Sequence, residues 1–576
     1  MSRSNYLATA ALVWALCPAI LHAQAFVDAD AHYKVMAANQ VEAKRGFLDY
    51  AETDLSVGSG TFPDRLDFQR LSAPSTSISQ SSGIIHKISW QRHNFEVLVA
   101  CDRDSGSNKD VNCGTELVTI GNTDYRFNFV NGAWQSIYND GNRLDQSADQ
   151  FVFTSRDGDR IIFPRSKNFY QYAGTAHLAS TWIFPDGNHL DFTYELVRAG
   201  NGGWNDWHHL VSVENAQGYG YRFSYLEPSG GQYNQDNWTN ADFRKITISS
   251  VQVIAPGCGA SCPSVSYGYQ SWGGTIPAMK LATVTDALGA VSNFTWTDGR
   301  NLVSETQKGS SALKFSATYD ARGGVTQLVD AAGQSWGYER KINNAVTDVY
   351  MTVVTDPKGG KTSYYFPYAG TITPQTITDP LGHVTTYSYD PASGWLTKVA
   401  FPEGNSIEYG YDGRGNLTRV TQHAKANFGA ADIAKVAVYP ADCANALICN
   451  KPSTSDWANN VTDYQYDAGT GLLTARTDPA VNGGVRPQQR YAYGQVQAAW
   501  SGTVWRLATL SECRTTASCS GTADETKTSW SYASSLLPTA MTVAAGDNSV
   551  SATTATTYDA LGNPATCTDP LGRVTT

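Results

Sequence analysis

A short phrase, Tyr-Asp-x-x-Gly, recurs along this chain and limits what it can fold into. A second phrase, Asp-Pro-Leu-Gly or a close variant, alternates with it. Asp356 to Asp379 spans 23 residues and Asp390 to Asp412 spans 22, so we infer a repeating unit of about 22 to 26 residues. The first phrase occurs as YDARG (319–323), YDGRG (411–415) and YDALG (558–562), with variants YDPASG (389–394) and YDAGTG (466–471); the second occurs as DPLG (379–382 and 569–572), with variants DPKG (356–359), DALG (286–289) and DAAG (330–333).

Both phrases predict tight turns. Asp at the first position, Pro at the second and Gly at the fourth are the preferences of a type I β-turn, because the aspartate side chain bonds backbone amides ahead of it and proline presets φ. The segments between the turns, such as 383–389 and 416–421, alternate in character and are rich in Thr, Val and Tyr, as half-buried strands are. The residues that define the repeat are Tyr319, Asp320, Gly323, Tyr389, Asp390, Tyr411, Asp412, Gly415, Tyr466, Asp467, Tyr558, Asp559 and Gly562, with Asp379, Pro380 and Gly382 for the second phrase.

The sequence therefore predicts an all-β fold, a repetitive antiparallel sheet of β-hairpins preceded by a β-rich N-terminal region. Tyrosines two residues apart share one face of a strand, so stacked hairpins would align their rings into a ladder held by many small packing terms. The alternative is a row of platforms on which sugars stack. The pairs are Tyr387/Tyr389, Tyr409/Tyr411, Tyr464/Tyr466 and Tyr491/Tyr493.

Composition agrees with strands and tight turns. The 576 residues include 51 glycines and 31 tyrosines, and 41% of the chain is hydrophobic. The formal net charge of -10 argues against nucleic acid as a partner, because binding to phosphates needs clustered Lys and Arg.

Residues 1–25 have the features of a secretory signal peptide, namely an early arginine, an apolar run and small residues at Ala23 and Ala25. The bulky residues just before Cys17 disfavour a lipoprotein signal. No later segment has the length of apolar sequence that a membrane-spanning helix requires. We expect the mature chain to be secreted or held at the cell surface, with no transmembrane segment after signal cleavage.

Nine cysteines remain after the signal, and eight fall into close pairs. In an exported chain such pairs are read most simply as disulfides that close local loops. Zinc is the alternative, although only the segment 258–262 comes near the spacing of zinc ligands. Cys567 is left over and suggests a partner beyond Thr576. The predicted pairs are Cys101 with Cys113, Cys258 with Cys262, Cys443 with Cys449, and Cys513 with Cys519.

The sequence carries no motif for catalysis. It has no His-Glu-x-x-His, no Gly-x-Ser-x-Gly and no phosphate-binding loop. The Asp-Ser-Gly at 104–106 resembles an aspartic-protease turn, but that chemistry needs two such turns. Calcium is a weak alternative for the same stretch, through Asp102, Asp104, Asn108 and Asp110. We therefore assign no catalytic, cofactor or metal residue, and we expect any enzymatic domain to lie beyond residue 576.

The repeats at 280–576 resemble the YD repeats of the rearrangement-hotspot (RHS) proteins, which include polymorphic toxins and shell components of insecticidal toxin complexes. Residues 26–280 resemble the family less closely, although 51–70 and 88–97 look like the region ahead of its repeats. The resemblance implies a long sheet that spirals into a shell around a C-terminal toxic domain. We expect a signal peptide (1–25), a β-rich N-terminal region (26–160), degenerate repeats (161–280) and RHS repeats (281–576), with insertions at 227–245 and 424–458, the second a disulfide-stapled surface loop.

Two functions are consistent with these features. The first is a scaffold or shell for the protein's own C-terminal toxin cargo in competition between bacteria. That cargo would lie beyond Thr576, where the chain stops inside a repeat. The second is cell-surface adhesion or carbohydrate binding, with glycans or proteins as partners and no toxin. We expect no cofactor in either case.

Overall fold

A computed structural model describes residues 35–72, 92–101, 114–121, 123–166, 168–171, 174–197, 207–227, 247–272, 278–297, 301–343, 348–367, 373–426, 428–458, 460–480, 484–513, 515–516 and 518–576. Several sequence predictions lie outside these residues. They are the signal peptide, most of the insertion at 227–245, Cys113 with its predicted bond to Cys101, and the candidate calcium loop.

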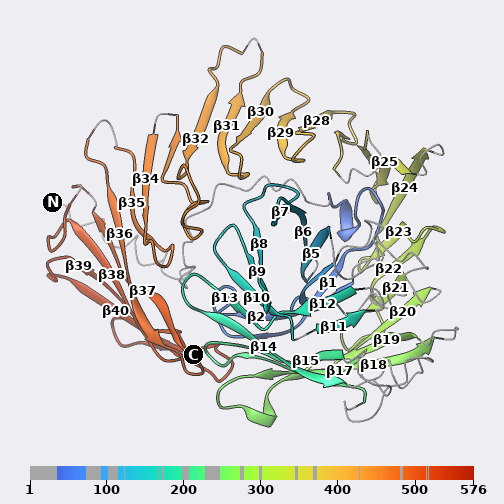
Figure 1. Cartoon of the computed structure of the whole chain (residues 1–576), viewed down its shortest axis with the longest axis horizontal. Coiled ribbons are helices and arrows are strands. Elements are labelled where there is room, and N and C mark those ends of the chain that lie inside the picture. Colours follow the sequence, from blue (N-terminus) through green and yellow to red (C-terminus); the bar gives the residue numbers. More distant parts are fainter. Residues whose placement is uncertain are drawn as a thin grey trace, which may run out of the picture.

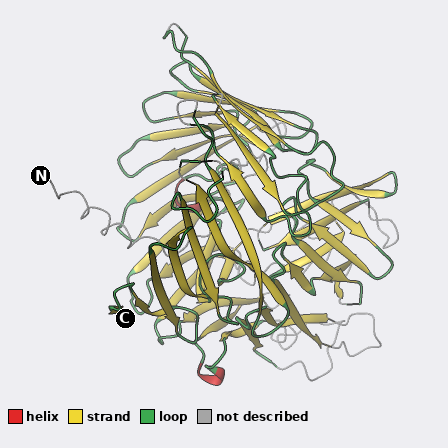
Figure 2. Ribbon diagram, turned by 90° about the vertical axis from the view of Figure 1, so that its left-hand side faces the viewer, coloured by secondary structure: helices red, strands yellow, loops and turns green. Residues whose placement is uncertain are grey.

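The described chain is built from β-strands, as the sequence predicts, and contains no α-helix. Two single-turn 3-10 helices, Ala38–Gln40 and Gly259–Ser261, are its helical elements. Figure 2 shows the strands side by side, with their connecting loops gathered at the strand ends. No helix in the described ranges has the length and apolar character needed to cross a membrane.

Two small sheets come from the N-terminal third of the chain. One has the strand order β1-β2-β3, and the other has the order β11-β12-β4-β5-β6-β7. Their strands are β1 (Tyr50–Val57), β2 (Leu66–Ser72), β3 (Arg92–His93), β4 (Val97–Cys101), β5 (Thr115–Ile120), β6 (Thr123–Val130), β7 (Ala133–Ser136), β11 (Asn168–Gln171) and β12 (Gly174–Leu178).

The rest of the described chain forms one antiparallel sheet of 33 strands. Backbone pairing runs from β8 through β9 and β10 to β13, and from there each strand pairs with the next as far as β42. The first part consists of β8 (Arg143–Gln146), β9 (Gln150–Thr154), β10 (Arg160–Pro164), β13 (Thr181–Ile183), β14 (His189–Val197), β15 (Trp207–Asn215), β16 (Gly220–Tyr225), β17 (Ile248–Ile254), β18 (Ser264–Trp272), β19 (Ala278–Thr285), β20 (Val291–Thr297), β21 (Asn301–Thr306), β22 (Leu313–Tyr319), β23 (Val325–Asp330), β24 (Ser335–Asn343), β25 (Asp348–Thr355) and β26 (Lys361–Tyr365).

The second part of the sheet contains the most regular repeats. It consists of β27 (Thr376–Thr378), β28 (Val384–Tyr389), β29 (Leu396–Ala400), β30 (Ser406–Tyr411), β31 (Leu417–His423), β32 (Ile433–Val438), β33 (Thr454–Trp457), β34 (Asn460–Tyr466), β35 (Leu473–Thr477), β36 (Gln488–Gln497), β37 (Thr503–Cys513), β38 (Glu525–Tyr532), β39 (Pro538–Ala545), β40 (Ser551–Tyr558), β41 (Pro564–Thr568) and β42 (Val574–Thr575).

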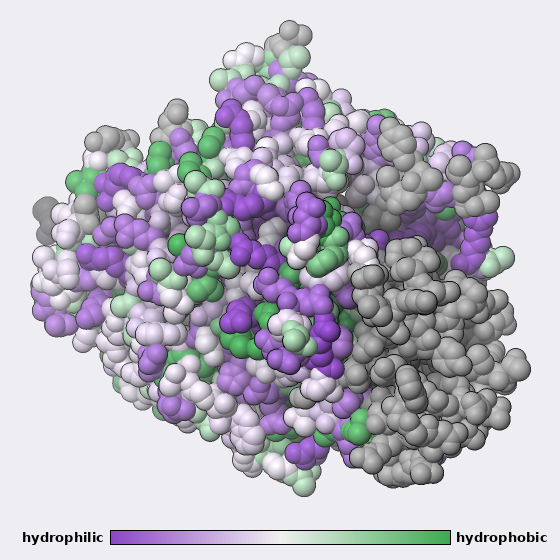
Figure 3. Space-filling view, viewed as in Figure 1, coloured by the Kyte–Doolittle hydropathy of each residue, from purple (hydrophilic) through white to green (hydrophobic). Residues whose placement is uncertain are grey.

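The long sheet coils into a ring, and the N-terminal strands lie inside it (Figure 1). The main hydrophobic core joins residues 35–72, the strands from β4 to β10 and the sheet from β14 to β26. Its largest fully buried side chains include Tyr221, Leu66 and Leu281. On the face seen in Figure 3, hydrophobic residues appear in small groups separated by hydrophilic ones.

The segment 424–458 differs from the surface loop that its sequence suggested. It contributes two strands, β32 and β33, that continue the ladder between β31 and β34. Only the part between these strands, 439–453, lies outside the ladder, and we call it the disulfide lobe. The segment lacks both turn phrases, so its two strands carried no recognisable repeat signal.

Candidate functional site

The turns divide between the two edges of the sheet. From β22 onward, Tyr-Asp turns follow even-numbered strands and define what we call the YD edge. Asp-Pro-Leu-Gly turns and their variants follow odd-numbered strands and define the opposite DP edge. In both kinds of turn the aspartate side chain accepts backbone N–H groups two and four residues ahead, at 2.9 and 3.0 Å for Asp412 and at 2.9 and 2.8 Å for Asp379. These bonds hold the carboxylate ionised, and they contribute to pKa values of Asp412 and Asp379 below the ordinary value despite opposing desolvation.

A β-bulge lies at each motif tyrosine. Gly410 pairs with Arg419 but Tyr411 pairs with Leu417, so Thr418 is an extra residue on the facing strand. The Thr418 hydroxyl donates to the Gly410 carbonyl oxygen at 3.1 Å. The same shift in register occurs at Tyr319, Tyr389, Tyr466, Tyr493, Tyr532 and Tyr558.

The motif tyrosines connect each hairpin to the one before it. The Tyr411 hydroxyl donates at 2.9 Å to the carbonyl oxygen of Leu396, the first bulge residue of the preceding hairpin. A bulge leaves backbone groups without ladder partners, and the tyrosine satisfies one of them. The same bond joins Tyr225 to Leu210, Tyr269 to Ile248, Tyr319 to Leu302, Tyr439 to Leu417, Tyr493 to Leu473, Tyr532 to Leu507 and Tyr558 to Pro538.

The sequence analysis did not predict these bulges. A signal was nevertheless present, because Leu-Thr follows the turn glycine by two residues at Leu396-Thr397, Leu417-Thr418 and Leu473-Thr474. The leucine supplies the carbonyl group and the threonine supplies the hydroxyl group that bridges the bulge.

The coil closes where the YD edge of later strands meets the DP edge of early ones. At the Arg506 junction, the guanidinium of Arg506 on β37 contacts Asp64 and bonds Asp186 at 2.8 Å. Asp64 lies in the β1–β2 turn and also accepts a bond from Gln217 at 2.7 Å. The backbone N–H of Trp505 donates to the Asp186 carbonyl oxygen at 2.8 Å. Turns that lie far apart in the sequence are therefore joined by one buried charged cluster.

Burial raises the pKa of the Asp64 carboxyl to about 6, against the opposing attraction of Arg506. The carboxylate of Asp186 nearby adds to this rise. Arg506 exposes only 7% of its side chain. The two carboxylates, rather than water, therefore surround and stabilise its guanidinium.

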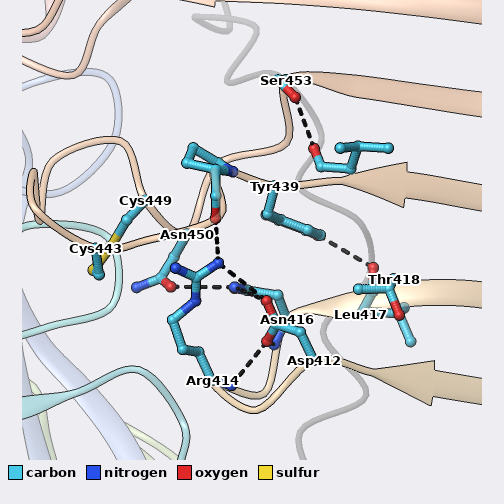
Figure 4. A network of polar contacts seen from close by, with 12 residues as sticks. Asp412, Arg414, Asn416, Leu417, Thr418, Tyr439, Cys443, Cys449, Asn450 and Ser453 are labelled. Carbon is cyan, nitrogen blue, oxygen red and sulfur yellow. Dashed lines mark hydrogen bonds and ion pairs between the residues drawn. A yellow bond between two sulfur atoms is a disulfide. The ribbon is translucent and has the colours of Figure 1, made fainter.

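The disulfide lobe forms a second junction, and Figure 4 shows its contacts with the YD turn at 411–415. Arg143 donates to the Cys443 carbonyl oxygen at 3.1 Å, and Asn450 donates to that of Arg156 at 3.2 Å. Asn416, in a YD turn, bonds Asn450 at 3.3 Å. The lobe therefore connects the turns of β8–β10 to the YD edge of β30–β31.

Three predicted cysteine pairs are disulfides in the structure: Cys258–Cys262, Cys443–Cys449 and Cys513–Cys519. Cys567 is free and exposed. Cys258 and Cys262 are bonded to each other, so neither has the free thiolate that a zinc ligand needs. The described part of the chain holds no group of three or more His, Cys, Asp or Glu side chains placed to hold a metal ion.

One face of the sheet carries the tyrosines, and residues 35–72 cover its first half. The Tyr221 hydroxyl donates to the Leu55 and Leu66 carbonyl oxygens, at 3.1 and 2.5 Å. Tyr267 donates to the carboxylate of Asp54 at 2.8 Å, and Tyr338 donates to the Ala38 carbonyl oxygen at 2.8 Å. At these three tyrosines the sheet donates and the covering segment accepts, whereas the Tyr50 hydroxyl of the covering segment donates to Glu305 of the sheet at 2.9 Å.

The same face continues into the second half of the sheet. Residues directly opposite each other in a ladder share a face, and the register connects Tyr364 through Ile377 and Thr385 to the strand of Tyr387. Residues 35–72 contact this half at its edge, where Asp64 meets Arg506 and the Gly58 N–H donates to the Leu561 carbonyl oxygen at 2.7 Å. The tyrosine side chains between β28 and β36 are partly exposed. We call this surface the open tyrosine face; it comprises Tyr387, Tyr409, Tyr464, Tyr491, Lys435 and Arg476.

These features define a class of protein, namely an all-β repeat scaffold in which hairpins are coupled through their turns and bulges. The family model described as RHS Repeat matches residues 374–400 and 392–424, which contain the most regular turns. Residues 374–424 are therefore similar to RHS repeats.

Solved structures give further likenesses at low identity. A crystal structure of TcdB2-TccC3 is 12% identical, with 80% of this chain and 28% of that chain covered and a TM-score of 0.32. A Tc holotoxin pore of Photorhabdus luminescens is 11% identical, with 90% and 34% covered and a TM-score of 0.30. The N-terminal domain of effector protein SpvB from Salmonella typhimurium strain LT2 is 10% identical, with 40% and 98% covered and a TM-score of 0.24. The chain spans about a third or less of the length of the two Tc chains.

Proposed function

We propose that this chain is the scaffold of an exported or surface-held RHS-repeat protein that encloses or presents a C-terminal toxin domain during competition between bacteria. The observation that supports this proposal is the open tyrosine face. Its rings are half-buried along many strands, and the first half of the same face is already covered by a polypeptide segment. A sheet face of this composition gains stability when further chain packs on it.

The test uses the natural reading frame through its stop codon. We expect residues encoded after Thr576 to resist trypsin in the intact protein and to be digested when the Arg506 junction is broken by Arg506→Glu. We also expect the full product to inhibit growth of a competitor strain. A reading frame that ends at 576, or a following segment digested equally fast in both proteins, would contradict the proposal.

Adhesion is the second candidate, because two tryptophans are exposed. Trp500 exposes 65% of its surface and Trp457 exposes 39%, and exposed aromatic rings are suitable platforms for sugars. Binding to a glycan array that disappears in Trp500→Ala and Trp457→Ala variants, with no growth inhibition by the full product, would favour this function.

A further inference from the structure

The disulfide lobe lies in a seam between two turns that are far apart in the sequence, the β9–β10 turn and the β34–β35 turn. On the first side, Leu447 packs so closely that a Cβ on Gly158 would lie 3.0 Å from its side chain. On the second side, Asn445 donates to the Ala468 carbonyl oxygen at 2.8 Å. The lobe therefore joins a late turn of the sheet to an early one.

Lys451 of the lobe also connects the two turns. Its ammonium group donates to the Gly471 carbonyl oxygen at 2.6 Å, on the β34–β35 side. The carboxylates of Asp157 and Asp159 attract it from the β9–β10 turn, although burial has the larger effect and lowers the pKa of Lys451. A buried charge is stable only beside such partners, so Lys451 requires the lobe to stay in place.

The disulfide closes the part of the lobe that makes these contacts. It joins Cys443 to Cys449, six residues apart. Asn445 and Leu447 lie within the ring that the bond closes, and Asn450 follows the ring directly (Figure 4). A short closed ring limits the conformations of its backbone. The bond therefore maintains the shape with which the lobe fits the seam.

The sulfur atoms of the described disulfides differ in their access to solvent. Cys443 is partly exposed, whereas Cys449 is buried. A small thiol must reach a disulfide sulfur to reduce the bond, so Cys443 is the point of attack. The Cys513–Cys519 bond is better protected, because its two cysteines expose only 4% and 1% of their surface.

We propose that the Cys443–Cys449 bond is a redox latch, which holds the disulfide lobe in the seam and releases it when a small thiol such as glutathione reduces the bond. The attacking thiolate bonds to the Cys443 sulfur, and Cys449 leaves as a thiolate and takes up a proton. A second glutathione then displaces Cys443, so the products are two cysteine thiols and one oxidised glutathione.

The latch would respond to the compartment that surrounds the protein. Disulfides persist in oxidising compartments and are kept reduced in the cytosol, so the seam would be closed in the first and open in the second. This behaviour goes beyond the proposed function and does not depend on what the chain encloses.

Hydrogen–deuterium exchange of the full chain, measured by mass spectrometry, tests the latch at residues 155–160 and 466–472, which we call the seam segments. In wild type, a glutathione buffer poised as in the cytosol should make both Cys443 and Cys449 available to alkylation. Backbone exchange in the seam segments should then become at least about tenfold faster, because the lobe no longer holds them. The variant Cys443→Ala/Cys449→Ala should show the fast exchange with and without glutathione.

The matched control is Cys258→Ala/Cys262→Ala. This variant removes a disulfide that closes the turn of the β17–β18 hairpin, where Gln252 of the same hairpin donates to the Cys262 carbonyl oxygen at 3.2 Å. It should leave exchange in the seam segments as slow as in oxidised wild type, and it should keep the response to glutathione. Wild type is compared before and after reduction, so the test does not depend on the folding of either variant.

Four results would each overturn the latch. The first is a Cys443–Cys449 bond that stays oxidised in the glutathione buffer, and the second is reduction of Cys513–Cys519 ahead of it. The third is unchanged exchange in the seam segments of wild type after alkylation has shown both thiols to be free. The fourth is equally fast exchange in these segments in the control variant without glutathione, which would indicate a general loss of stability.

Discussion

Two tyrosines two residues apart on β30 make different contacts. Tyr411 donates to the Leu396 carbonyl oxygen at the preceding bulge, whereas the Tyr409 hydroxyl has no bond within the described chain. Both rings pack on Leu417 and Ala437. The spacing in the sequence makes the two tyrosines look equivalent, and only the bulge distinguishes them.

We predict that Tyr411→Phe lowers the free energy of unfolding by about 1 kcal/mol, because the Leu396 carbonyl loses its donor. Tyr409→Phe should change it by much less. Urea unfolding of the full chain, followed by circular dichroism, measures both. Equal losses in the two variants would contradict a specific role for the bond between Tyr411 and Leu396.

Asp64 should make the Arg506 junction sensitive to pH. Its pKa is raised to about 6 from an ordinary value of 3.8, so the folded state binds a proton that the unfolded state releases. This contribution to stability is fully present below about pH 4 and is lost as pH rises through about 6. Its size is at most about 3 kcal/mol.

The measurement compares the pH dependence of unfolding in wild type and in Asp64→Asn, which cannot titrate. The difference in unfolding free energy between wild type and variant should fall from pH 4 to pH 7. A constant or rising difference would contradict this account. It would show that the attraction of Arg506, which lowers the pKa of Asp64, outweighs burial, which raises it.

At the scale of elements, the turn glycines have unequal surroundings. Gly415 and Gly382 both have positive φ, +78° and +86°. A Cβ on Gly415 would lie 2.8 Å from the Asn139 backbone oxygen, whereas a Cβ on Gly382 would meet nothing within 4 Å. The YD turn at 411–415 therefore seats against another turn, and the DP turn at 379–382 does not.

Gly382→Ala should cost about 1 kcal/mol, which is the backbone strain of a positive φ. Gly415→Ala should cost that strain plus about 1–3 kcal/mol for the steric clash. Thermal unfolding of the two variants measures the difference. Equal shifts in melting temperature would argue against the contact between the YD edge and the β7–β8 loop.

The elements that the sequence predicted are those fixed by local contacts. Each turn is closed by bonds within five residues, such as Asp412 to Asn416. The residues that make these bonds are close in the sequence and therefore form a recognisable motif. Strands β32 and β33 are not flanked by either turn motif, and the prediction of a surface loop for residues 424–458 is wrong for these two strands. The Arg506 junction joins residues 320 and 442 positions apart, and no spacing in the sequence could indicate it.

At the scale of the whole molecule, the form comes from one ladder and from contacts between its edges, which include the two junctions. The ladder places neighbouring strands side by side without a break from β8 to β42. The junctions seat the YD edge of later strands on turns of β8–β10 and β13–β16. The sheet consequently returns to its own beginning around the N-terminal strands (Figure 1). The covered half of the tyrosine face contacts residues 35–72.

The return of the sheet to its beginning can be measured as a distance between spin labels. Labels at Thr193→Cys on β14 and Gln497→Cys on β36, in a Cys567→Ser background, occupy exposed positions near the Arg506 junction. We predict a narrow distance distribution below about 30 Å. In an uncoiled sheet with strands about 4.8 Å apart, the labels would be about 100 Å from each other, and a spectrum with no distance below about 60 Å would contradict the coiled sheet.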